Sequence, residues 1–145
     1  MNSSPDISAC ASCLCVATRK ASRAVTSVYD RALAPYGIRI TQFTILANLH
    51  LRGATSLGEL AKFLGLDRTT LTRNLELVEE KNWVRSRPAN EDSRSRILNI
   101  TDDGRAAVFA AFPAWRAAQE HVAAATSGHD IALLSQLAEI AQRQR

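Results

Sequence analysis

The sequence predicts a mainly α-helical fold that carries one small β-hairpin, and three observations predict it. Apolar residues recur at helical spacing over most of the 145 residues. A tight turn at Gly65 separates two short helical patterns, which is the arrangement of a helix-turn-helix. Strand-like patterns follow at 83–85 and 96–100, with a polar segment between them. A hairpin placed after a helix-turn-helix makes a winged helix-turn-helix.

The first expected helix lies within residues 10–36. Small apolar side chains repeat at helical spacing along it, while arginine, lysine and serine occupy the other side. Pro35 and Gly37 end this helix. Thr41 is then expected to cap a short apolar helix that runs to about Leu51.

Capping residues predict the two helices of the helix-turn-helix. Ser56 is followed three residues later by Glu59, a capping-box pattern that begins a helix at 57–64. The next glycine ends that helix. Asp67 can then cap a second helix at about 68–81.

The helix at 68–81 is expected to present a polar face at its N-terminal end. Leu71, Leu75 and Val78 fall at i, i+4 and i+7 and therefore face the core. The other side of the first two turns carries groups that can contact phosphates and read base edges in a major groove. Because glutamates come later, insertion by the N-terminal end is expected. These candidate DNA-contacting residues are Arg68, Thr69, Thr70, Thr72, Arg73 and Asn74.

The segment between the two expected strands forms a polar, basic hairpin tip. Asp92 lies two residues before Arg94, so its carboxylate can hold that guanidinium in one orientation through a charge-assisted bond. An arginine held at a projecting tip suits a narrow minor groove. A polar helix face alone is also typical of an ordinary solvated surface, but a basic hairpin after it favours nucleic-acid binding.

Two further helices follow the hairpin. Thr101 is expected to cap a long alanine-rich helix that runs from Asp102 to about Ala125, with Pro113 as a kink. A serine–glycine pair ends it, and a last amphipathic helix follows.

The 145 residues are interpreted as one chain with a DNA-binding lobe at 41–100 and dimerisation helices at 10–36 and 102–144. The terminal helices carry apolar stripes that a lobe of this size cannot bury. A second copy of the chain is the simplest partner that could bury these apolar stripes. We therefore expect a homodimer formed by the N- and C-terminal helices.

Composition excludes several classes of protein. A content of 46% hydrophobic and 22% charged residues argues against a disordered chain. The net charge of +4 is a mild excess that permits a polyanionic partner. No apolar run is long enough for a membrane helix, so no membrane partner is expected. Because no catalytic constellation or glycine-rich phosphate loop stands out, we expect neither an enzyme nor a cofactor.

The stretch from Leu60 to Arg73, LAKFLGLDRTTLTR, resembles the helix-turn-helix of MarR-type regulators. The wing with Asp92 and Arg94, the residues from Leu98 to Gly104, and the start of the helix near Thr41 are also similar to that family. The resemblance covers about residues 15–125. It implies a homodimer on a pseudo-palindromic operator in double-stranded DNA, usually a repressor that a ligand or oxidation releases. It also implies that Thr69, Thr70, Thr72 and Arg73 enter the major groove and Arg94 the minor groove.

Three cysteines, Cys10, Cys13 and Cys15, lie close to the N-terminus. This clustering is unlike a secreted disulfide framework and favours a cytoplasmic protein. In a continuous helix, Cys10 and Cys13 would share a face and Cys15 would not. Three thiolates can bind a soft metal or metalloid, although tetrahedral zinc needs a fourth ligand, and no resident metal is expected. The thiols can also sense oxidants, or pack in the dimer interface without a sensing role.

From Cys15 onward, the first helix resembles the organic-hydroperoxide-responsive branch of the family. Cys15 falls where that branch has its peroxide-reactive cysteine, and Tyr29 where a tyrosine hydrogen-bonds that cysteine across the dimer. Arg19 and Ile40 stand where the branch has two other tyrosines. Oxidation of Cys15, with one of the other two cysteines as the resolving thiol, is therefore one candidate release signal.

A small aromatic acid or phenol is the other candidate effector, since family members often bind such compounds between the dimer helices and the DNA-binding lobe. A basic group beside aromatic rings suits an aromatic carboxylate. Phe109, Phe112 and Trp115 sit at near-helical spacing, however, and that pattern is more typical of a core. The candidate lining residues are Tyr36, Arg39, His50, Phe112, Trp115 and Arg116.

Overall fold

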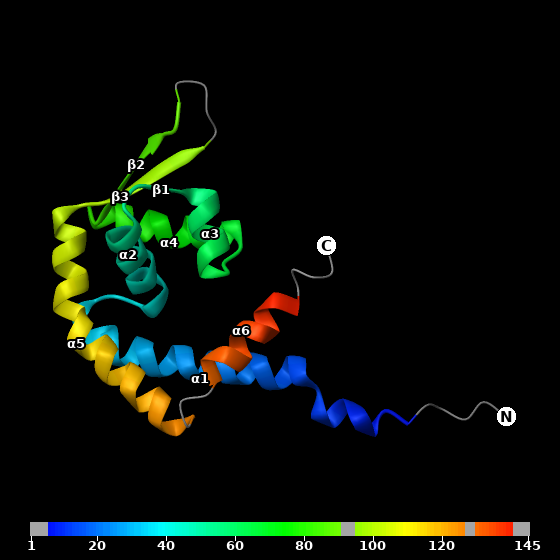
Figure 1. Cartoon of the computed structure of the whole chain (residues 1–145). Coiled ribbons are helices and arrows are strands. Elements are labelled where there is room, and N and C mark those ends of the chain that lie inside the picture. Colours follow the sequence, from blue (N-terminus) through cyan, green and yellow to red (C-terminus); the bar gives the residue numbers. More distant parts are fainter. Residues whose placement is uncertain (1–5, 91–94, 127–129, 141–145) are drawn as a thin grey trace.

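The computed structural model describes residues 6–90, 95–126 and 130–140, and most of them lie in helices (Figure 1). The prediction of a mainly helical winged helix-turn-helix is confirmed. In chain order the elements are η1 (Ser8–Ser12), α1 (Leu14–Leu33), η2 (Ala34–Tyr36), α2 (Ile40–Arg52), β1 (Thr55–Ser56), α3 (Leu57–Leu64), α4 (Arg68–Glu80), β2 (Val84–Pro88), β3 (Arg96–Ile100), α5 (Asp102–Ala125) and α6 (Asp130–Ile140).

The N-terminal region is not one continuous helix. Cys10 lies in the 3₁₀ helix η1, Cys13 is an extended residue with φ −66° and ψ 116°, and Cys15 lies in α1. Cys10 and Cys13 therefore do not share a face of one α-helix, because the extended residue breaks the helical repeat between them. At the other end, Gly37 closes η2 with a left-handed φ of 65°, in agreement with the predicted helix end.

Helix α2 begins at Ile40, and Thr41 is not its cap, contrary to the prediction. The amide of Ile40 donates to Asp30 Oδ1 at 2.8 Å. The amide of Arg39 donates to Gln42 Oε1 at 3.2 Å. Groups from α1 and from the helix itself thus satisfy donors that a capping threonine would otherwise serve.

Helices α3 and α4 form the predicted helix-turn-helix. Ser56 Oγ accepts from the amide of Glu59 at 3.3 Å, and Glu59 Oε2 accepts from the amide of Ser56 at 3.2 Å. Gly65 turns the chain with a left-handed φ of 63°. Asp67 then caps α4 by accepting from the amide of Thr70 at 2.8 Å. The capping residues Ser56 and Asp67 thus predict the first residue of both helices correctly. Helix α4 ends one residue earlier than expected.

Strands β2 and β3 form the predicted hairpin, and a strand that was not predicted completes the sheet. The strand order is β1-β3-β2, and both pairings are antiparallel. Thr55 lies opposite Leu98, and Val84 lies opposite Ile100. Strand β1 spans two residues, which is too short for an alternating pattern to reveal. It forms because β3 offers a second edge for backbone hydrogen bonds.

One apolar core joins the lobe to the long helices. Its buried side chains come from α1, α2, α3, α4, the sheet and α5, and they include Leu33, Ile45, Leu46, Leu60, Leu71, Leu98 and Val108. Figure 1 shows α5 running from the sheet toward α1, with α2 and α4 lying between the sheet and α1. Strands β2 and β3 of the hairpin project from the end of the molecule that lies away from α1. Because these elements share one core, packing contacts fix the position of α4 relative to α1, α2 and α5.

Helix α5 begins and ends as predicted, and Thr101 Oγ1 accepts from the amide of Gly104 at 3.0 Å. Pro113 lies inside α5, and Figure 1 shows the helix changing direction along its length. The expected break at residues 127–129 lies outside the described residues. Apolar side chains at both ends of the described chain are exposed, namely Ile7, Leu14 and Val16 near the N-terminus and Ile131, Leu133, Leu134 and Ile140 in α6.

Candidate nucleic-acid interface

Helix α4 places one apolar face in the core and turns its polar face outward. Leu71, Leu75 and Val78 are each 0% exposed, as their spacing predicts. Arg68 and Arg73 are exposed on the other side of the first two turns. The buried face therefore fixes the helix, and the exposed face is free to contact a ligand such as DNA.

The cap of α4 also fixes the position of its first turn. Asp67 Oδ2 accepts from the hydroxyl of Thr70 at 2.5 Å, and Asp67 Oδ1 accepts from the amide of Thr70 at 2.8 Å. These two bonds, the hydroxyl bond first, lower the pKa of Asp67 below its ordinary value. Thr70 is therefore engaged in holding the helix start, and the residue is partly buried.

Two other candidate residues are also bonded to the helix backbone. Thr72 Oγ1 donates to the carbonyl of Arg68 at 2.8 Å, and Asn74 Nδ2 donates to the carbonyl of Thr70 at 2.9 Å. Their side-chain oxygens remain available as acceptors. Within the described part of the chain, the side chains of Arg68, Thr69 and Arg73 contact no hydrogen-bonding or charged partner. The structure thus separates Arg68, Thr69 and Arg73, whose side-chain donors are free within the described residues, from three engaged residues. In Thr70, Thr72 and Asn74 the side-chain donors bond to Asp67 or to the helix backbone. The spacing of the residues in the sequence could not show this difference.

The hairpin contributes further positive charge beside α4. Arg85 and Arg87 are exposed and alternate along β2, so they project from the same face of the strand. Arg96 differs from them: its Nη2 lies 2.9 Å from Glu79 Oε1 on α4 and also contacts the hydroxyl of Ser86. Arg96 therefore ties the hairpin to α4 instead of projecting from it. The predicted tip residues Asp92 and Arg94 lie outside the described residues.

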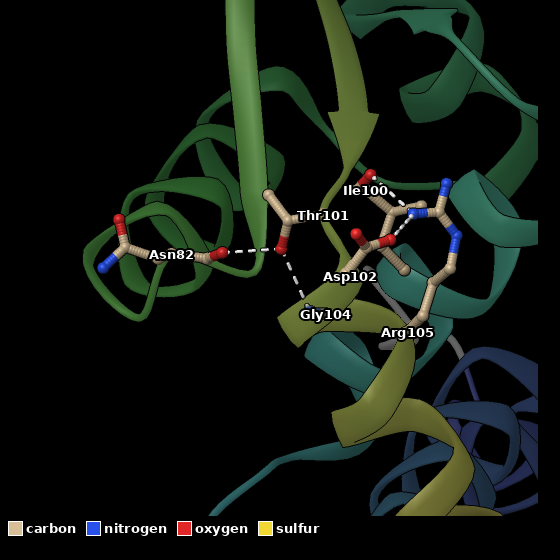
Figure 2. Close-up of polar contacts among 6 residues, drawn as sticks. All are labelled: Asn82, Ile100, Thr101, Asp102, Gly104 and Arg105. Atoms are coloured by element: carbon tan, nitrogen blue, oxygen red, sulfur yellow. Dashed lines mark hydrogen bonds and ion pairs between the residues drawn. The ribbon is translucent and has the colours of Figure 1, made fainter.

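A polar junction connects α4, the sheet and α5 (Figure 2). Thr101 Oγ1 donates to the carbonyl of Asn82 at 2.6 Å and accepts from the amide of Gly104 at 3.0 Å. Asn82 has a left-handed φ of 56°, which turns the chain from α4 into β2. Arg105 Nη1 donates to Asp102 Oδ1 at 3.0 Å beside this turn. One threonine thus caps α5 and anchors the end of α4 at the same time, a second role that the sequence did not reveal.

The cysteines lie far along the chain from the polar face of α4. Cys10, Cys13 and Cys15 are all free and exposed. Arg19 Nη2 lies 3.6 Å from Cys15 Sγ, one turn further along α1. Among the described residues, which include all three cysteines, no group of three or more His, Cys, Asp or Glu side chains is placed to hold a metal ion.

Tyr29 is buried, and its hydroxyl donates to Gln119 Oε1 within the same chain. Burial raises the pKa of Tyr29, which keeps the hydroxyl protonated. The resemblance implies that the hydroxyl of Tyr29 donates a hydrogen bond to a cysteine of the partner chain. In this chain the same hydroxyl proton is already donated to Gln119. The oxygen of Tyr29 can still accept a hydrogen bond.

An apolar pocket of about 570 Å³ opens between α2 and α5. It collects three of the six candidate effector-binding residues, His50, Phe112 and Trp115, whereas Tyr36, Arg39 and Arg116 do not line it. The ring of Trp115 stacks on those of Phe43 and Phe112, with centroid distances of 5.7 and 5.6 Å. The expectation that the aromatic residues of α5 are core is wrong for two of them, since Phe109 is 58% exposed and Phe112 is 43% exposed.

The described helices include none that is long and apolar enough to cross a bilayer. This agrees with the uncharged stretches of the sequence, which are too short for a membrane span.

Comparisons with known proteins place these features in context. The profile described as MarR family matches residues 38–95. Among solved structures, the transcriptional regulator MosR of M. tuberculosis in complex with DNA is 42% identical, with a TM-score of 0.75, and the match covers 89% of this chain and 98% of that chain. The DNA-bound chain is thus similar over nearly its whole length.

Two curated relatives are more distant. The HTH-type transcriptional regulator PecS of Dickeya dadantii is 30% identical over 106 residues, which are 71% of this chain and 60% of PecS. The organic hydroperoxide resistance transcriptional regulator of Bacillus subtilis is 29% identical over 91 residues, which are 63% of this chain and 62% of that protein. The chain therefore matches about three fifths of the length of each of these relatives.

Proposed function

The chain belongs to the MarR family, and from this premise we propose that it is a sequence-specific DNA-binding transcriptional regulator. It acts as a homodimer on a pseudo-palindromic operator, as a repressor that an effector releases. This role implies a cytoplasmic protein and no enzymatic activity.

The observation that carries the proposal is the N-terminal face of α4. Arg68, Thr69 and Arg73 project from a helix whose other face is locked in the core by Leu71 and Leu75. Arginine donors suit the acceptor atoms of guanine in the major groove, and the hydroxyl of Thr69 suits a phosphate or a base edge. The exposed arginines of β2 add contacts to DNA phosphates, and these contacts do not depend on the base sequence.

The homodimer is supported by the apolar surface at the two ends of the described chain. Leu14 is 73% exposed and Ile131 is 69% exposed, and further apolar side chains of α1 and α6 accompany them. Side chains of this kind favour burial by about 25 cal/mol per Å² of apolar area. A two-fold pairing covers both ends at once, because each interface patch meets its own copy.

Selection from a pool of random DNA duplexes tests the proposal. We expect the purified protein to enrich an inverted repeat whose half-sites are about one helical turn apart, as the two-fold dimer requires. Sedimentation should show two chains per duplex. Recovery of no preferred sequence, or of a single half-site bound by one chain, would contradict it.

The wing has its own test. We expect Arg94→Ala to weaken operator binding several-fold, because an arginine inserted in the minor groove contributes charge and hydrogen bonds there. The selected operator and a fixed salt concentration should be used, since phosphate contacts make affinity depend on salt. An unchanged affinity would remove Arg94 from the interface.

Release by oxidation is supported by the exposed sulfur of Cys15, with Arg19 beside it at 3.6 Å, and by the relative named for organic hydroperoxide resistance. Oxidation of an exposed thiol to a sulfenic acid or disulfide changes its polarity and bonding. We expect cumene hydroperoxide to release wild-type protein from DNA and Cys15→Ser to stay bound. A variant with all three cysteines changed to serine that still responds normally would overturn this mechanism.

Release by a small aromatic acid or phenol is supported by the pocket between α2 and α5. Its walls are stacked rings with His50 as an ionisable group, which suits a flat ring with an acidic substituent. Benzoate is a suitable probe. We expect it to quench Trp115 fluorescence at saturable concentrations and to weaken operator binding, and Phe112→Ala to lessen both effects. A Phe112→Ala protein that responds like the wild type would count against this pocket.

A further inference from the structure

An acidic side chain lies among the basic and hydroxyl groups on the polar face of α4. Glu76 lines a hollow of about 420 Å³ on that face. The other residues that line this hollow are Arg68, Thr69, Thr72 and Arg73, all of them proposed DNA contacts. The order of residues in the sequence predicts that the glutamates lie beyond the DNA contacts, whereas the structure places Glu76 beside them.

Helical geometry accounts for this placement. Glu76 follows Thr72 by four residues and Arg73 by three, and side chains with these spacings are neighbours on the surface of an α-helix. Arg73 and Glu76 are separated by about 4.5 Å along the axis of α4. This separation is close to the rise of about 3.4 Å between successive base pairs. The two side chains can therefore meet neighbouring base pairs of one half-site.

The carboxylate of Glu76 has no hydrogen-bonding or charged partner in the described part of the chain. Glu79, three residues later, differs from it, because Glu79 Oε1 lies 2.9 Å from Arg96 Nη2. Glu76 is exposed, and neither Arg68 nor Arg73 forms an ion pair with it. Both oxygens of its carboxylate therefore remain available as acceptors on the face that is proposed to meet DNA.

A free carboxylate on this face distinguishes between DNA sequences. DNA phosphates repel it, so it lowers the affinity for every duplex in which it gains no hydrogen bond. In the major groove it can accept from the N4 amino group of cytosine. Adenine also offers an amino group, but the N7 acceptor of adenine lies beside that group and repels the second carboxylate oxygen. Guanine and thymine present acceptors to the major groove, which a carboxylate cannot pair with.

We propose that Glu76 is a specificity-determining residue, which selects a cytosine in each operator half-site by accepting a hydrogen bond from its N4 amino group. The same carboxylate weakens binding to sequences that lack this cytosine. Glu76 thus contributes to the choice of sequence and not to the overall affinity for DNA. The inference rests on the proposed function, because it requires α4 to enter a major groove.

Selection from random DNA duplexes with the wild type, Glu76→Ala and Glu76→Gln tests the proposal. The matched control is Glu80→Ala, which removes the same charge from an exposed position of α4 one turn further on, outside the hollow. We expect the wild type to enrich a cytosine in each half-site that Glu76→Ala no longer selects. Glu76→Gln should accept adenine at that position as well, because a glutamine amide bonds to both N6 and N7 of adenine.

Affinities measured at one salt concentration give the size of the effect. Replacing the selected C·G pair by T·A should weaken binding of the wild type at least about fivefold, and binding of Glu76→Ala less than about twofold. Glu80→Ala should respond to this replacement like the wild type. Because Glu76 has no partner within the described residues, its variants should melt at the temperature of the wild type.

The proposal is overturned when Glu76→Ala enriches the same sequences as the wild type, or when Glu80→Ala loses the same base preference. A wild-type operator without a cytosine that depends on Glu76 overturns it and leaves the proposed function intact. A wild type that enriches no sequence at all overturns both. Because Glu76→Gln keeps the size and polarity of the side chain, its change in base preference separates base reading from a structural role of this residue.

Discussion

Replacing Gly104 with alanine tests how the reading helix and the hairpin are fixed to α5. Gly104 is buried in the first turn of α5 and faces the turn between α4 and β2. A Cβ atom at this position would lie 2.2 Å from the carbonyl oxygen of Trp83 and 2.8 Å from Cγ1 of Ile100. The carbonyl of Trp83 cannot easily retreat, because it also accepts from the amide of Thr101 at 3.0 Å.

The expected loss follows from three contributions. Overpacking a buried site costs about 1–3 kcal/mol, and a contact this short belongs at the upper end. Weakening the hydrogen bond at Trp83 costs about 1 kcal/mol. The higher helix propensity of alanine offsets about 1 kcal/mol of this loss in the free energy of unfolding. We therefore expect Gly104→Ala to lower the free energy of unfolding by about 2–3 kcal/mol, a large share of the roughly 5–15 kcal/mol typical of a domain.

Gly58 provides a matched control, since it lies in α3 and a Cβ atom added there would meet nothing within 4 Å. Gly58→Ala should raise the free energy of unfolding by about 0.5–1 kcal/mol. Urea unfolding followed by circular dichroism gives both values, at one protomer concentration because dimer stability depends on it. The reasoning is refuted when Gly104→Ala unfolds at the urea midpoint of the wild type.

Two further predictions concern the anchoring of α4. The hydrogen bonds from Thr70 lower the pKa of Asp67, so the stability they contribute is present above about pH 4 and is lost as the pH falls through the lower folded value. Asp67→Asn caps without ionising, and its melting temperature should therefore fall less on acidification below pH about 4; identical acid profiles would contradict this. For Arg96 and Glu79, a double-mutant cycle with alanine should give a coupling of about 0.2–1 kcal/mol in stability, because the pair is partly exposed. A coupling of zero would mean that the pair does not hold the hairpin to α4.

Much of the fold could be predicted because its signals are local. Ser56, Asp67 and Thr101 each cap a helix through bonds to residues three positions later, and each of these helices begins where the sequence placed it. The exceptions depend on distant partners. Helix α2 starts without a threonine cap because Asp30, ten residues earlier, accepts from Ile40. Strand β1 forms only against β3, more than 40 residues later, as its pairing with residues 97 and 98 shows.

The candidate site shows the same division. Helical spacing was enough to predict which face of α4 is buried. It could not show that the donors of Thr72 and Asn74 bond to their own helix, since that depends on side-chain rotamers. Nor could it separate Arg96, which meets Glu79 across the fold, from the exposed arginines of the hairpin. The exposed ring of Phe109 follows the helical period of a core residue but lacks a covering element within the described chain.

The most direct test of the central claim is the affinity of Arg73→Ala for the selected operator at fixed salt. Arg73 is exposed on α4 and has no partner within the described residues, so its loss removes a contact to DNA and little else. We predict an affinity about 5-fold to about 150-fold weaker, corresponding to about 1–3 kcal/mol, with unchanged thermal stability. Arg116→Ala, which removes the same charge from α5, should bind like the wild type. Equal affinity of Arg73→Ala and the wild type would contradict the assignment of α4 as the reading helix.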